Sequence, residues 1–314
     1  MKLKKEYAII VLVIIGLSLY IYSRTSDRIN YELPQPDPVN TKEVTRISLY
    51  KQGKVLTLAR ENGQWTAGQK GYPASTGSIE NLLEALDRFR ISDLVSRSKN
   101  YARYSLDQES AIEVKAWAGR DLVRSFRVGK QASTYRNSYV KLADDPNIYL
   151  SMTNMKQALD KELDDFQDKV VLRFDEKKLQ KIVIQVPGDS LSLTREKDRP
   201  GQEEDGPEEP RSTGWLVNGD KEVDTLLVDT LFQSIDGLTC SSYLEHRQKQ
   251  DFHSPDYRLT LLNGQEDVLS LYLDKEQENV KRYRGTSKEN RFPFVLSRQK
   301  GKKIVEALNS FLNL

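Results

Sequence analysis

The chain has 314 residues, and 48 Lys and Arg against 46 Asp and Glu leave a net charge of only +2. A balance this even provides no general attraction for nucleic acid, so we expect no nucleic-acid partner. Hydrophobic residues make up 38% and charged residues 30%, which is enough apolar material for folded domains and is unlike a disordered chain. The single cysteine, Cys240, excludes an internal disulfide and is expected to be a buried thiol.

The amino-terminal stretch predicts a membrane anchor. Three lysines among residues 1–6 precede the run YAIIVLVIIGLSLYIY at 7–22, which contains no charge. We expect residues 1–23 to form a cytoplasmic tip and a single transmembrane helix, with the lysines keeping the amino terminus inside. The anchor residues are Tyr7 and Tyr20 and Tyr22 near the membrane surfaces and Ile15 near the middle. A cleaved signal peptide is the alternative, but LYIYSRTSD offers no small-x-small cleavage site.

This orientation predicts a location as well. The rest of the chain should be exported, which makes the protein a single-pass protein of a bacterial inner membrane with periplasmic domains. Residues 24–41 follow the anchor and contain alternating prolines at 34, 36 and 38. Each proline fixes its own φ and favours extended geometry in the residue before it. We therefore expect a semi-rigid spacer, although a Pro-rich ligand for a partner remains an alternative.

One folding pattern occurs twice. A strand–turn–strand pattern ending in a tryptophan at 47–65 returns at 182–215, and each copy is followed by a helix. Equivalent landmarks keep nearly constant separations of 150, 145 and 146 positions, namely Trp65 and Trp215, Gly119 and Gly264, and Leu150 and Leu296. Such spacing predicts an α+β protein with two tandem repeat units, 42–165 and 166–314. Each unit should be a mainly antiparallel sheet with helices packed on one face.

The first unit can be followed element by element. Strands are expected at 44–50 and 55–60, and a helix at 79–89 is expected to begin with Ser78 as its cap. The remaining expected elements are strands at 91–96, 112–116, 122–128, 137–142 and 147–150, with a turn at 101–106 and a short helix at 154–163.

The second unit repeats this plan with an addition. Its expected helix covers 221–235, its later strands cover 256–262, 268–273, 280–284 and 292–296, and a terminal helix places Ile304, Leu308 and Phe311 on one face. An acidic insertion at 196–214 contains GQEEDGPEEP, which lacks the ligand spacing of a calcium loop. We expect a flexible hairpin tip there.

The first unit carries a candidate binding surface. Basic and aromatic side chains alternate between 120 and 141 in a pattern suited to a polyanion. The alternative, which we favour, is the solvated face of an antiparallel sheet. The candidate residues are Arg120, Arg124, Arg127, Tyr135, Arg136 and Tyr139.

Catalytic and metal signatures are weak. Gly188–Leu191 spells GDSL, the signature of an esterase family, but it falls at a predicted hairpin turn, and Asp251 and His253 lack the Asp-x-x-His spacing. Cys240 and His246 would make two metal ligands without a third. The sequence therefore predicts no catalytic residue, no metal, no cofactor and no enzyme activity.

Several segments resemble a known bacterial family. These are ENGQW at 61–65, GYPASTGSIENLLEAL at 71–86, NYARYSLD at 100–107, FRVGK at 126–130 and IYLSM at 148–152. Together with the anchor they resemble the family called domain of unknown function 4340. The resemblance covers most of 44–174 and the second unit more loosely. It implies a membrane-anchored envelope protein without known activity, often encoded beside ABC-type transporters and GldG-like proteins. The acidic insertion and the missing second copy of NYARYSLD depart from it.

The resulting expectation is a non-enzymatic accessory or scaffold subunit of an ABC-type transport or gliding-like complex. Its expected partners are the lipid bilayer, an ABC-type permease and a GldG-like protein. The alternative is a periplasmic glycan- or peptide-binding module that uses a cleft between the units. A GDSL-type hydrolase is the third reading, which the lack of a credible catalytic triad disfavours.

Overall fold

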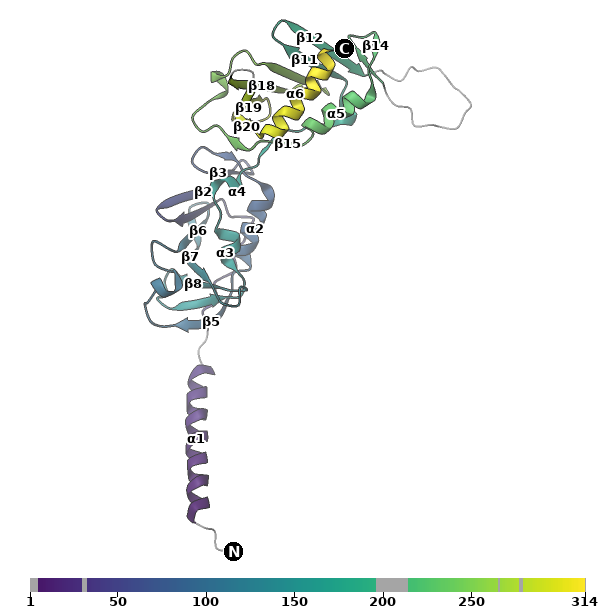
Figure 1. Ribbon diagram of the computed structural model, residues 1–314. Helices are drawn as coiled ribbons and strands as arrows, with labels where there is room; N and C mark the ends of the chain where they lie inside the picture. The colour runs from purple at the N-terminus through teal and green to yellow at the C-terminus, as the bar shows by residue number, and fades with distance from the viewer. Residues whose placement is uncertain (1–4, 30–32, 196–213, 265, 277–278, 314) are drawn as a thin grey trace. The chain divides into compact units, whose positions relative to one another are not determined.

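The computed structural model describes residues 5–29, 33–195, 214–264, 266–276 and 279–313 (Figure 1). The fold is α+β, with two large antiparallel sheets and several helices. The chain divides into two compact units, Met1–Phe166 and Gln167–Leu314, which are described separately below. The predicted acidic insertion lies outside the described residues except for Gly214.

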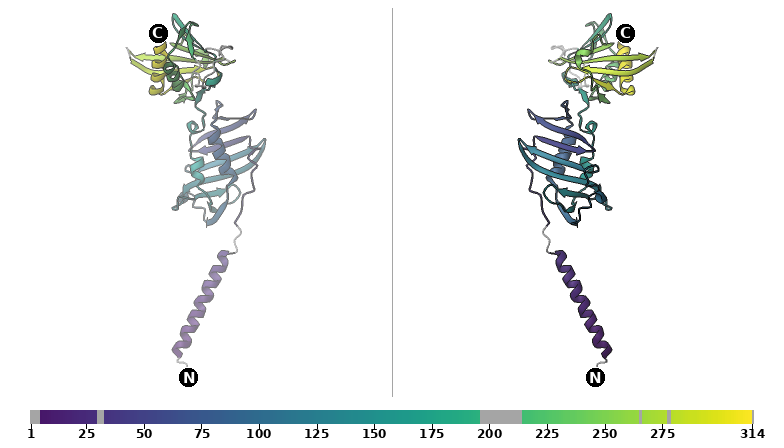
Figure 2. Two further views of the ribbon diagram at one scale, coloured as in Figure 1. Left: turned by 90° about the vertical axis from the view of Figure 1, so that its right-hand side faces the viewer. Right: turned by 90° about the vertical axis from the view of Figure 1, so that its left-hand side faces the viewer.

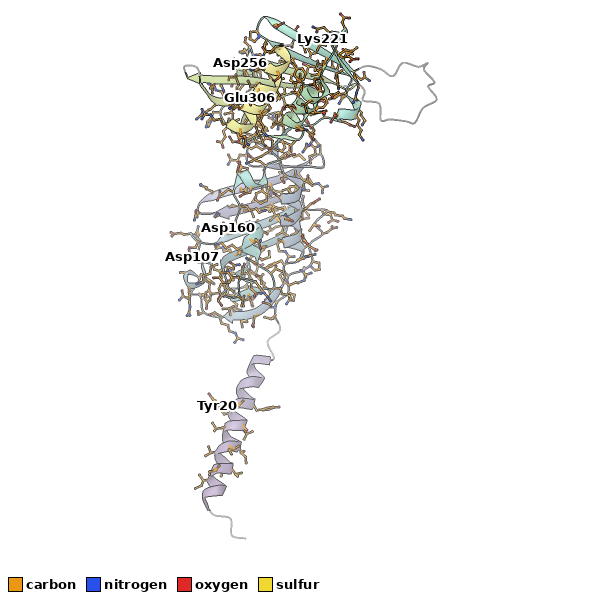
Figure 3. All side chains as sticks on the ribbon, turned by 45° about the vertical axis from the view of Figure 1, so that its right-hand side comes forward. Tyr20, Asp107, Asp160, Lys221, Asp256 and Glu306 are labelled. Atoms are coloured by element: carbon orange, nitrogen blue, oxygen red, sulfur yellow. The ribbon has the colours of Figure 1, made fainter. Side chains whose placement is uncertain are left out.

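The first helix, α1, covers Lys5–Ile29. It continues past the predicted end of the anchor at residue 23, and the first part of the predicted spacer is therefore helical. No proline or glycine interrupts residues 23–29, so nothing in the sequence stops the helix there. Ile15, Tyr20 and Tyr22 are exposed on α1, as Figure 3 shows for Tyr20, whereas the side chain of Tyr7 lies outside the described part. No helix in the described residues has the length and apolar content needed to cross a bilayer.

The sheet of unit 1 begins with the predicted hairpin. Residues Arg46–Lys51 pair with Lys54–Glu61 across a turn in which Gln52 and Gly53 both have positive φ. Every described ladder in this sheet is antiparallel. The strands lie in the order β4 (Tyr72–Pro73), β3 (Gln64–Ala67), β2 (Lys54–Glu61), β1 (Arg46–Lys51), β6 (Ile112–Ala118), β7 (Asp121–Gln131), β8 (Ser138–Leu142), β9 (Ile148–Ser151) and β5 (Ile91–Ser96).

Helices cover one face of this sheet, which we call the inner face. Ile79, Leu82 and Leu86 of α2 (Thr76–Asp87) are buried in one core with sheet residues such as Ile47 and Val114. The shorter helices α3 (Met155–Leu159) and α4 (Leu163–Phe166) add Met155, Leu159 and Phe166 to the same core. This layering is visible in Figures 1 and 2. The opposite, outer face of the sheet carries the polar half of the strand alternation.

Two predicted helix boundaries of unit 1 are wrong. Ser75, rather than Ser78, caps α2, since its side chain accepts the amide of Ser78. The hydroxyl of Ser78 instead donates to the carbonyl of Asp165 at 2.8 Å, and this bond ties α2 to α4. The helix expected at 154–163 ends at Leu159, because Asp160 leaves the helical conformation with ψ 65°, and a separate helix, α4, begins only at Leu163.

Unit 2 contains a second antiparallel sheet. Its order is β14 (Lys221–Glu222), β13 (Trp215–Val217), β12 (Asp189–Arg195), β11 (Lys181–Val186), β17 (Tyr257–Leu262), β18 (Glu266–Glu276), β19 (Asn279–Ser287), β20 (Phe294–Leu296) and β16 (Ser242–Tyr243). A separate small ladder joins β10 (Val170–Leu172) to β15 (Leu238–Thr239). The strand order repeats that of unit 1, element for element, with β1 corresponding to β11 and β6 to β17.

Helices α5 (Thr225–Ile235) and α6 (Arg298–Leu312) lie side by side in unit 2 (Figure 1). Asp224 caps α5 and Ser297 caps α6 through their side-chain oxygens. The predicted start of α5 at residue 221 is wrong, because Lys221 and Glu222 form strand β14 before the cap. Val228 and Ile235 of α5 and Leu308 of α6 are buried.

Each unit has a loop that covers part of its outer face. In unit 1 the loop around η1 (Ala102–Tyr104) lies over β7, since a Cβ on Gly129 would meet the carbonyl oxygen of Tyr104. The Tyr104 ring also contacts the ring of Tyr139, with centroids 4.8 Å apart. In unit 2 the loop around η3 (Lys249–Asp251) places Phe252 against Tyr272, at 5.0 Å. Unit 2 therefore has a covering loop although it lacks the NYARYSLD sequence.

Residues 33–40 correct the prediction of a spacer. Leu33 packs against the core of unit 1, and Val39 is buried in it. The side-chain amide of Gln35 donates to the carbonyl of Ile91 at 3.0 Å and accepts the Ile91 amide at 3.3 Å. The proline-containing segment is therefore part of unit 1, because its apolar residues gain burial there that an extended spacer would leave in water.

Candidate functional site

The six residues of the predicted basic surface do not form one site. Arg127 and Tyr139 lie on the outer face of the unit 1 sheet, as the preferred reading expected. Arg120 is exposed at the turn before β7, and Tyr135 and Arg136 are exposed in the loop after β7. These two loops are at opposite ends of a strand of about 35 Å. Arg124 is not on the surface at all.

Arg124 lies in the core, and its membership of the predicted surface is wrong. Only 7% of the residue is exposed, on the same face of β7 as Phe126 and Val128. Its Nη2 donates to the carbonyl of Asp37, and its guanidinium carbon is 5.8 Å from the centroid of Phe89. Burial lowers the pKa of the Arg124 guanidinium, nearby Arg90 lowers it further, and Asp37 and Asp87 oppose this change. Arg124 thus fastens the 33–40 segment to the sheet.

A groove opens on the outer face of unit 1 beside the β1–β2 turn, and we call it the outer groove. Its volume is about 170 Å³. The β1–β2 hairpin forms one wall, and the covering loop with β6 and β7 forms the other. The lining residues are Tyr50, Lys51, Gln52, Gly53, Lys54, Val55, Gln108, Ala111, Glu113 and Arg127.

The carboxylate of Glu113 is at the centre of a charge network in this groove. Lys115 lies 2.7 Å from Oε1, and Arg127 Nη2 lies 3.2 Å from Oε2. The hydrogen bond from Lys115 lowers the pKa of Glu113, and the positive charge of Arg127 adds to this lowering. The Lys115 ammonium also lies 4.9 Å from the ring centroid of Tyr50. Because both carboxylate oxygens accept from cations, Glu113 is held ionised and is a poor proton donor.

Lys51 at the other side of the groove is also paired. Its ammonium lies 2.7 Å from Asp160 and 2.9 Å from Glu162, which join α3 and α4 to the hairpin. The hydrogen bond to Asp160, followed by that to Glu162, raises the pKa of Lys51. Lys51 therefore ties the connection between α3 and α4 to the β1–β2 hairpin.

These contacts limit the chemistry of the outer groove. Its volume is below the roughly 300–1,000 Å³ of small-molecule sites. The ionic side chains at its centre are satisfied by each other, and no nucleophile lies beside an available base among its lining residues. In the described part of the chain, no group of three His, Cys, Asp or Glu side chains is arranged to hold a metal. The geometry fits a contact surface better than a catalytic centre.

The GDSL string occupies the turn where the sequence predicted it. Gly188 has φ +89°, and Val186 pairs with Asp189 as the hairpin β11–β12 closes. Ser190 is exposed, and its amide donates to the carboxylate of Asp189 at 2.7 Å. A glycine with positive φ and an Asp that accepts a local amide are ordinary turn chemistry. His246 and His253 are exposed in the covering loop of unit 2.

Cys240 belongs to a buried polar cluster in unit 2. The neighbouring Tyr243 hydroxyl donates to the carbonyl of Asp168 and accepts from the amide of Asn290 at 2.8 Å. Burial raises the pKa of Tyr243. The backbone amide of Cys240 donates to the carbonyl of Lys169 at 2.8 Å. The cluster therefore fastens residues 168 and 169 at the start of unit 2, much as Gln35 and Arg124 fasten 33–40 in unit 1.

The sequence reading missed several residues that the structure makes informative. Gln35 and Met152 bind adjacent backbone groups. Gln35 bonds to Ile91, and the amide of Met152 donates to the carbonyl of Arg90 at 2.9 Å. No local pattern marks either residue. The position of Arg124 could have been recognised, because alternation places it on the same face as Phe126 and Val128.

Comparisons with known proteins give one match. Residues 65–260 match the family described as Domain of unknown function (DUF4340), which covers more than half of the chain. No curated protein and no solved structure matches the chain.

Proposed function

Since the chain belongs to the DUF4340 family, we propose that it is a membrane-anchored envelope protein that acts by binding, as an accessory or scaffold subunit of a transport complex. The proposal combines an anchor, α1, with two units built to one plan. The envelope location, with the amino terminus in the cytoplasm and both units in the periplasm, follows from the lysines at positions 2, 4 and 5.

The exposed apolar surface of α1 is the observation that supports its role as a membrane anchor. Every large apolar side chain described from Ile9 to Tyr22 is more than half exposed, on all sides of the helix. A helix that is apolar all round needs an apolar environment, and lipid would supply it. The uncharged run at 7–22 is about 24 Å long as a helix, somewhat less than a hydrocarbon core of about 30 Å. Flanking lysines that extend toward the headgroups would make up the difference.

The anchor is tested by membrane fractionation of the full chain. Ile15→Lys places a charge at the middle of the run, at a cost of about 2.5–3.5 kcal/mol for insertion. We expect it to release the protein from membranes washed with alkaline carbonate. Tyr22→Lys introduces the same charge at the end of the run, where the side chain can reach water, and should remain bound. The anchor would be overturned if Ile15→Lys stayed with the washed membranes as Tyr22→Lys does. It would also be overturned if the unaltered chain were released.

The scaffold role is supported by the character of the sites. The groove on unit 1 is small and its charges are mutually satisfied, which suits recognition of a protein surface rather than turnover. The family resemblance adds an ABC-type permease and a GldG-like protein as candidate partners. We expect both to co-purify with the full chain in mild detergent. Crosslinking that recovers no membrane protein would count against this role.

A second candidate, binding of a periplasmic glycan or peptide, is favoured by the outer face of unit 1. Arg46 lies 4.1 Å from the ring centroid of Trp117, and Lys115 lies near Tyr50, so two aromatic rings there are paired with cations. Soluble peptidoglycan fragments should then change the fluorescence of the full chain, and Trp117→Ala should abolish the change. Unchanged fluorescence would remove this candidate.

A further inference from the structure

The chain enters unit 1 close to the end of α1. Helix α1 ends at Ile29, and Gln35 is fixed to the edge strand β5 by its two hydrogen bonds with Ile91. The chain between Ile29 and Gln35 spans at most about 20 Å, even when fully extended. Whatever the arrangement of the two parts, the Ile91 end of β5 therefore stays within this span plus the reach of the Gln35 side chain from the end of α1.

Two loops of unit 1 lie beside the Arg90–Ile91 stretch where the chain enters. The amide of Met152 donates to the carbonyl of Arg90, and the side chain of Asn137 donates to the carbonyl of Met152 at 3.3 Å. The loop that precedes Asn137 carries Tyr135 and Arg136. We call Tyr135, Arg136 and Met152 the apex. A short series of backbone contacts therefore connects the apex to the entry point of the chain.

The apex exposes unusual side chains for a water-facing loop. Tyr135 is 75% exposed and Met152 is 59% exposed, more than any other large apolar side chain described in residues 33–166. Scattered exposed apolar residues are common, but here two of them lie at the same end of the sheet, next to the entry point. An aromatic ring with a polar tip and a flexible thioether are suited to a boundary between apolar and aqueous regions.

The backbone of the apex is held in a costly conformation. Tyr135 has φ +60°, which is uncommon for a residue with a bulky side chain. Its carbonyl accepts from Gln131 at 2.7 Å and from Asn154 at 3.5 Å, and its amide donates to the carbonyl of Ala132. These bonds stabilise a loop in which glycine or asparagine would be less strained. Strain of this kind supports a role for the side chain that it presents.

Basic side chains accompany the apex. Arg136 is exposed beside Tyr135, and Arg88, whose side chain is 70% exposed, lies just before the Arg90–Ile91 stretch. Acidic residues are also present, since Arg88 pairs with Glu84 at 2.8 Å. Arginine binds phosphate oxygens well, and cations near an anionic lipid surface strengthen peripheral binding.

We propose that the apex docks into the headgroup region of the anionic bilayer that holds α1, so that unit 1 touches the membrane at a second point. The inference rests on the proposed anchoring by α1, and it adds the lipid surface as a partner of the unit itself. Tyr135 and Met152 enter the headgroup layer, and Arg136 binds lipid phosphates. Two attachment points limit the rotation of unit 1 about the α1 tether.

The test uses the full chain reconstituted into vesicles of equal parts phosphatidylglycerol and phosphatidylcholine. An environment-sensitive fluorophore is attached to Tyr135→Cys, and in separate samples to Met152→Cys and Leu122→Cys. Leu122 is 52% exposed but lies at the other end of β7, so it is the matched control. Cys240 is buried, and the unaltered chain treated in parallel measures its background labelling. Nitroxide-bearing lipid should reduce the fluorescence at 135 and 152 at least twofold and leave that at 122 unchanged.

Charge variants give an independent readout. Arg136→Glu should reduce the quenching of the label at 135, as should vesicles of phosphatidylcholine alone, whereas Arg120→Glu makes the same charge change away from the apex and should have no effect. Equal quenching at 135 and 122, or no dependence on lipid charge, would overturn the docking while leaving the anchor intact. Flotation of the vesicles is measured first, and protein that does not float with them would overturn the anchor and the docking together.

Discussion

Gly301 in α6 provides a prediction in which the structure reverses the expectation from helix propensity. Replacing a helical glycine with alanine normally stabilises a helix by about 1 kcal/mol. Here a Cβ on Gly301 would lie within 2.5 Å of Cδ1 and Cδ2 of Tyr283, a buried ring on the neighbouring strand β19. The ring cannot move outward without opening the core of unit 2.

The magnitude follows from two opposing terms. Overpacking of this severity costs about 3 kcal/mol, the upper part of the usual range, and the helix gain offsets about 1 kcal/mol. We therefore expect Gly301→Ala to lower the free energy of unfolding of unit 2 by about 2 kcal/mol. With a urea slope of about 2 kcal/mol per molar, the midpoint should fall by about 1 M.

The assay is urea unfolding of the full chain in detergent, followed by tryptophan fluorescence. Trp215 is the buried reporter in unit 2, while Trp65 and Trp117 report on unit 1. Gly77→Ala in α2 is the control, since nothing lies within 4 Å of its Cβ position, and it should stabilise unit 1 by about 0.5–1 kcal/mol. A Gly301→Ala variant as stable as the unaltered chain would refute the packing argument.

Three further predictions concern unit 1. The Tyr135→Gly variant should be more stable than Tyr135→Ala by about 1 kcal/mol in urea unfolding, because only glycine accepts φ +60° without strain. Equal stability of the two variants would show that the backbone at position 135 is not strained. Because the pKa of Glu113 is lowered in the folded state, its stabilisation is present above its ordinary value of 4.5 and is lost as the pH falls through the lower folded value. Glu113→Gln should therefore reduce the loss in free energy of unfolding between pH 5 and pH 3, by up to about 1 kcal/mol. An unchanged dependence of this free energy on pH would contradict the pairing of Glu113 with Lys115. Arg124→Ala should speed hydrogen exchange at the amide of Ile91 and destabilise unit 1 by about 2 kcal/mol, because the Asp37 carbonyl loses a charged donor that ties it to the sheet. Faster exchange limited to the neighbours of Arg124 would show that Arg124 does not hold the 33–40 segment.

Several elements were predictable because their signals are local. The strand pairs around Gln52–Gly53 and Pro187–Gly188 follow from turn residues between alternating apolar positions, since Gln52, Gly53 and Gly188 take positive φ and proline favours a turn. The apolar stripe of α2 is readable from helical spacing alone. The boundaries were less certain, since Ser75 and Ser78 are both suitable caps by composition. Which of them caps α2 depends on the carbonyl of Asp165, far along the chain, which takes the Ser78 hydroxyl.

The candidate site was predicted less well, for a physical reason. A run of Arg and Tyr along a strand and two turns reads as one surface, but a strand directs alternate side chains to opposite faces. That rule separates Arg127 from the buried Arg124, and the length of β7 separates Arg120 from Tyr135. The outer groove was not predicted, because Lys51, Gln108 and Glu113 come together only after distant segments pack.

The sequence by itself determined the family, the α+β class, the apolar run of α1 and the repeated spacing of landmarks, since each depends on residue order over short distances. Only the tertiary structure decided that the proline segment belongs to unit 1, because the burial of Leu33 and Val39 and the donation from Arg124 require partners far along the chain. The tertiary structure likewise showed that unrelated sequences, one around Tyr104 and one around Phe252, cover equivalent faces. Ring packing on a sheet depends on shape and position, so it survives changes in sequence that erase a recognisable motif.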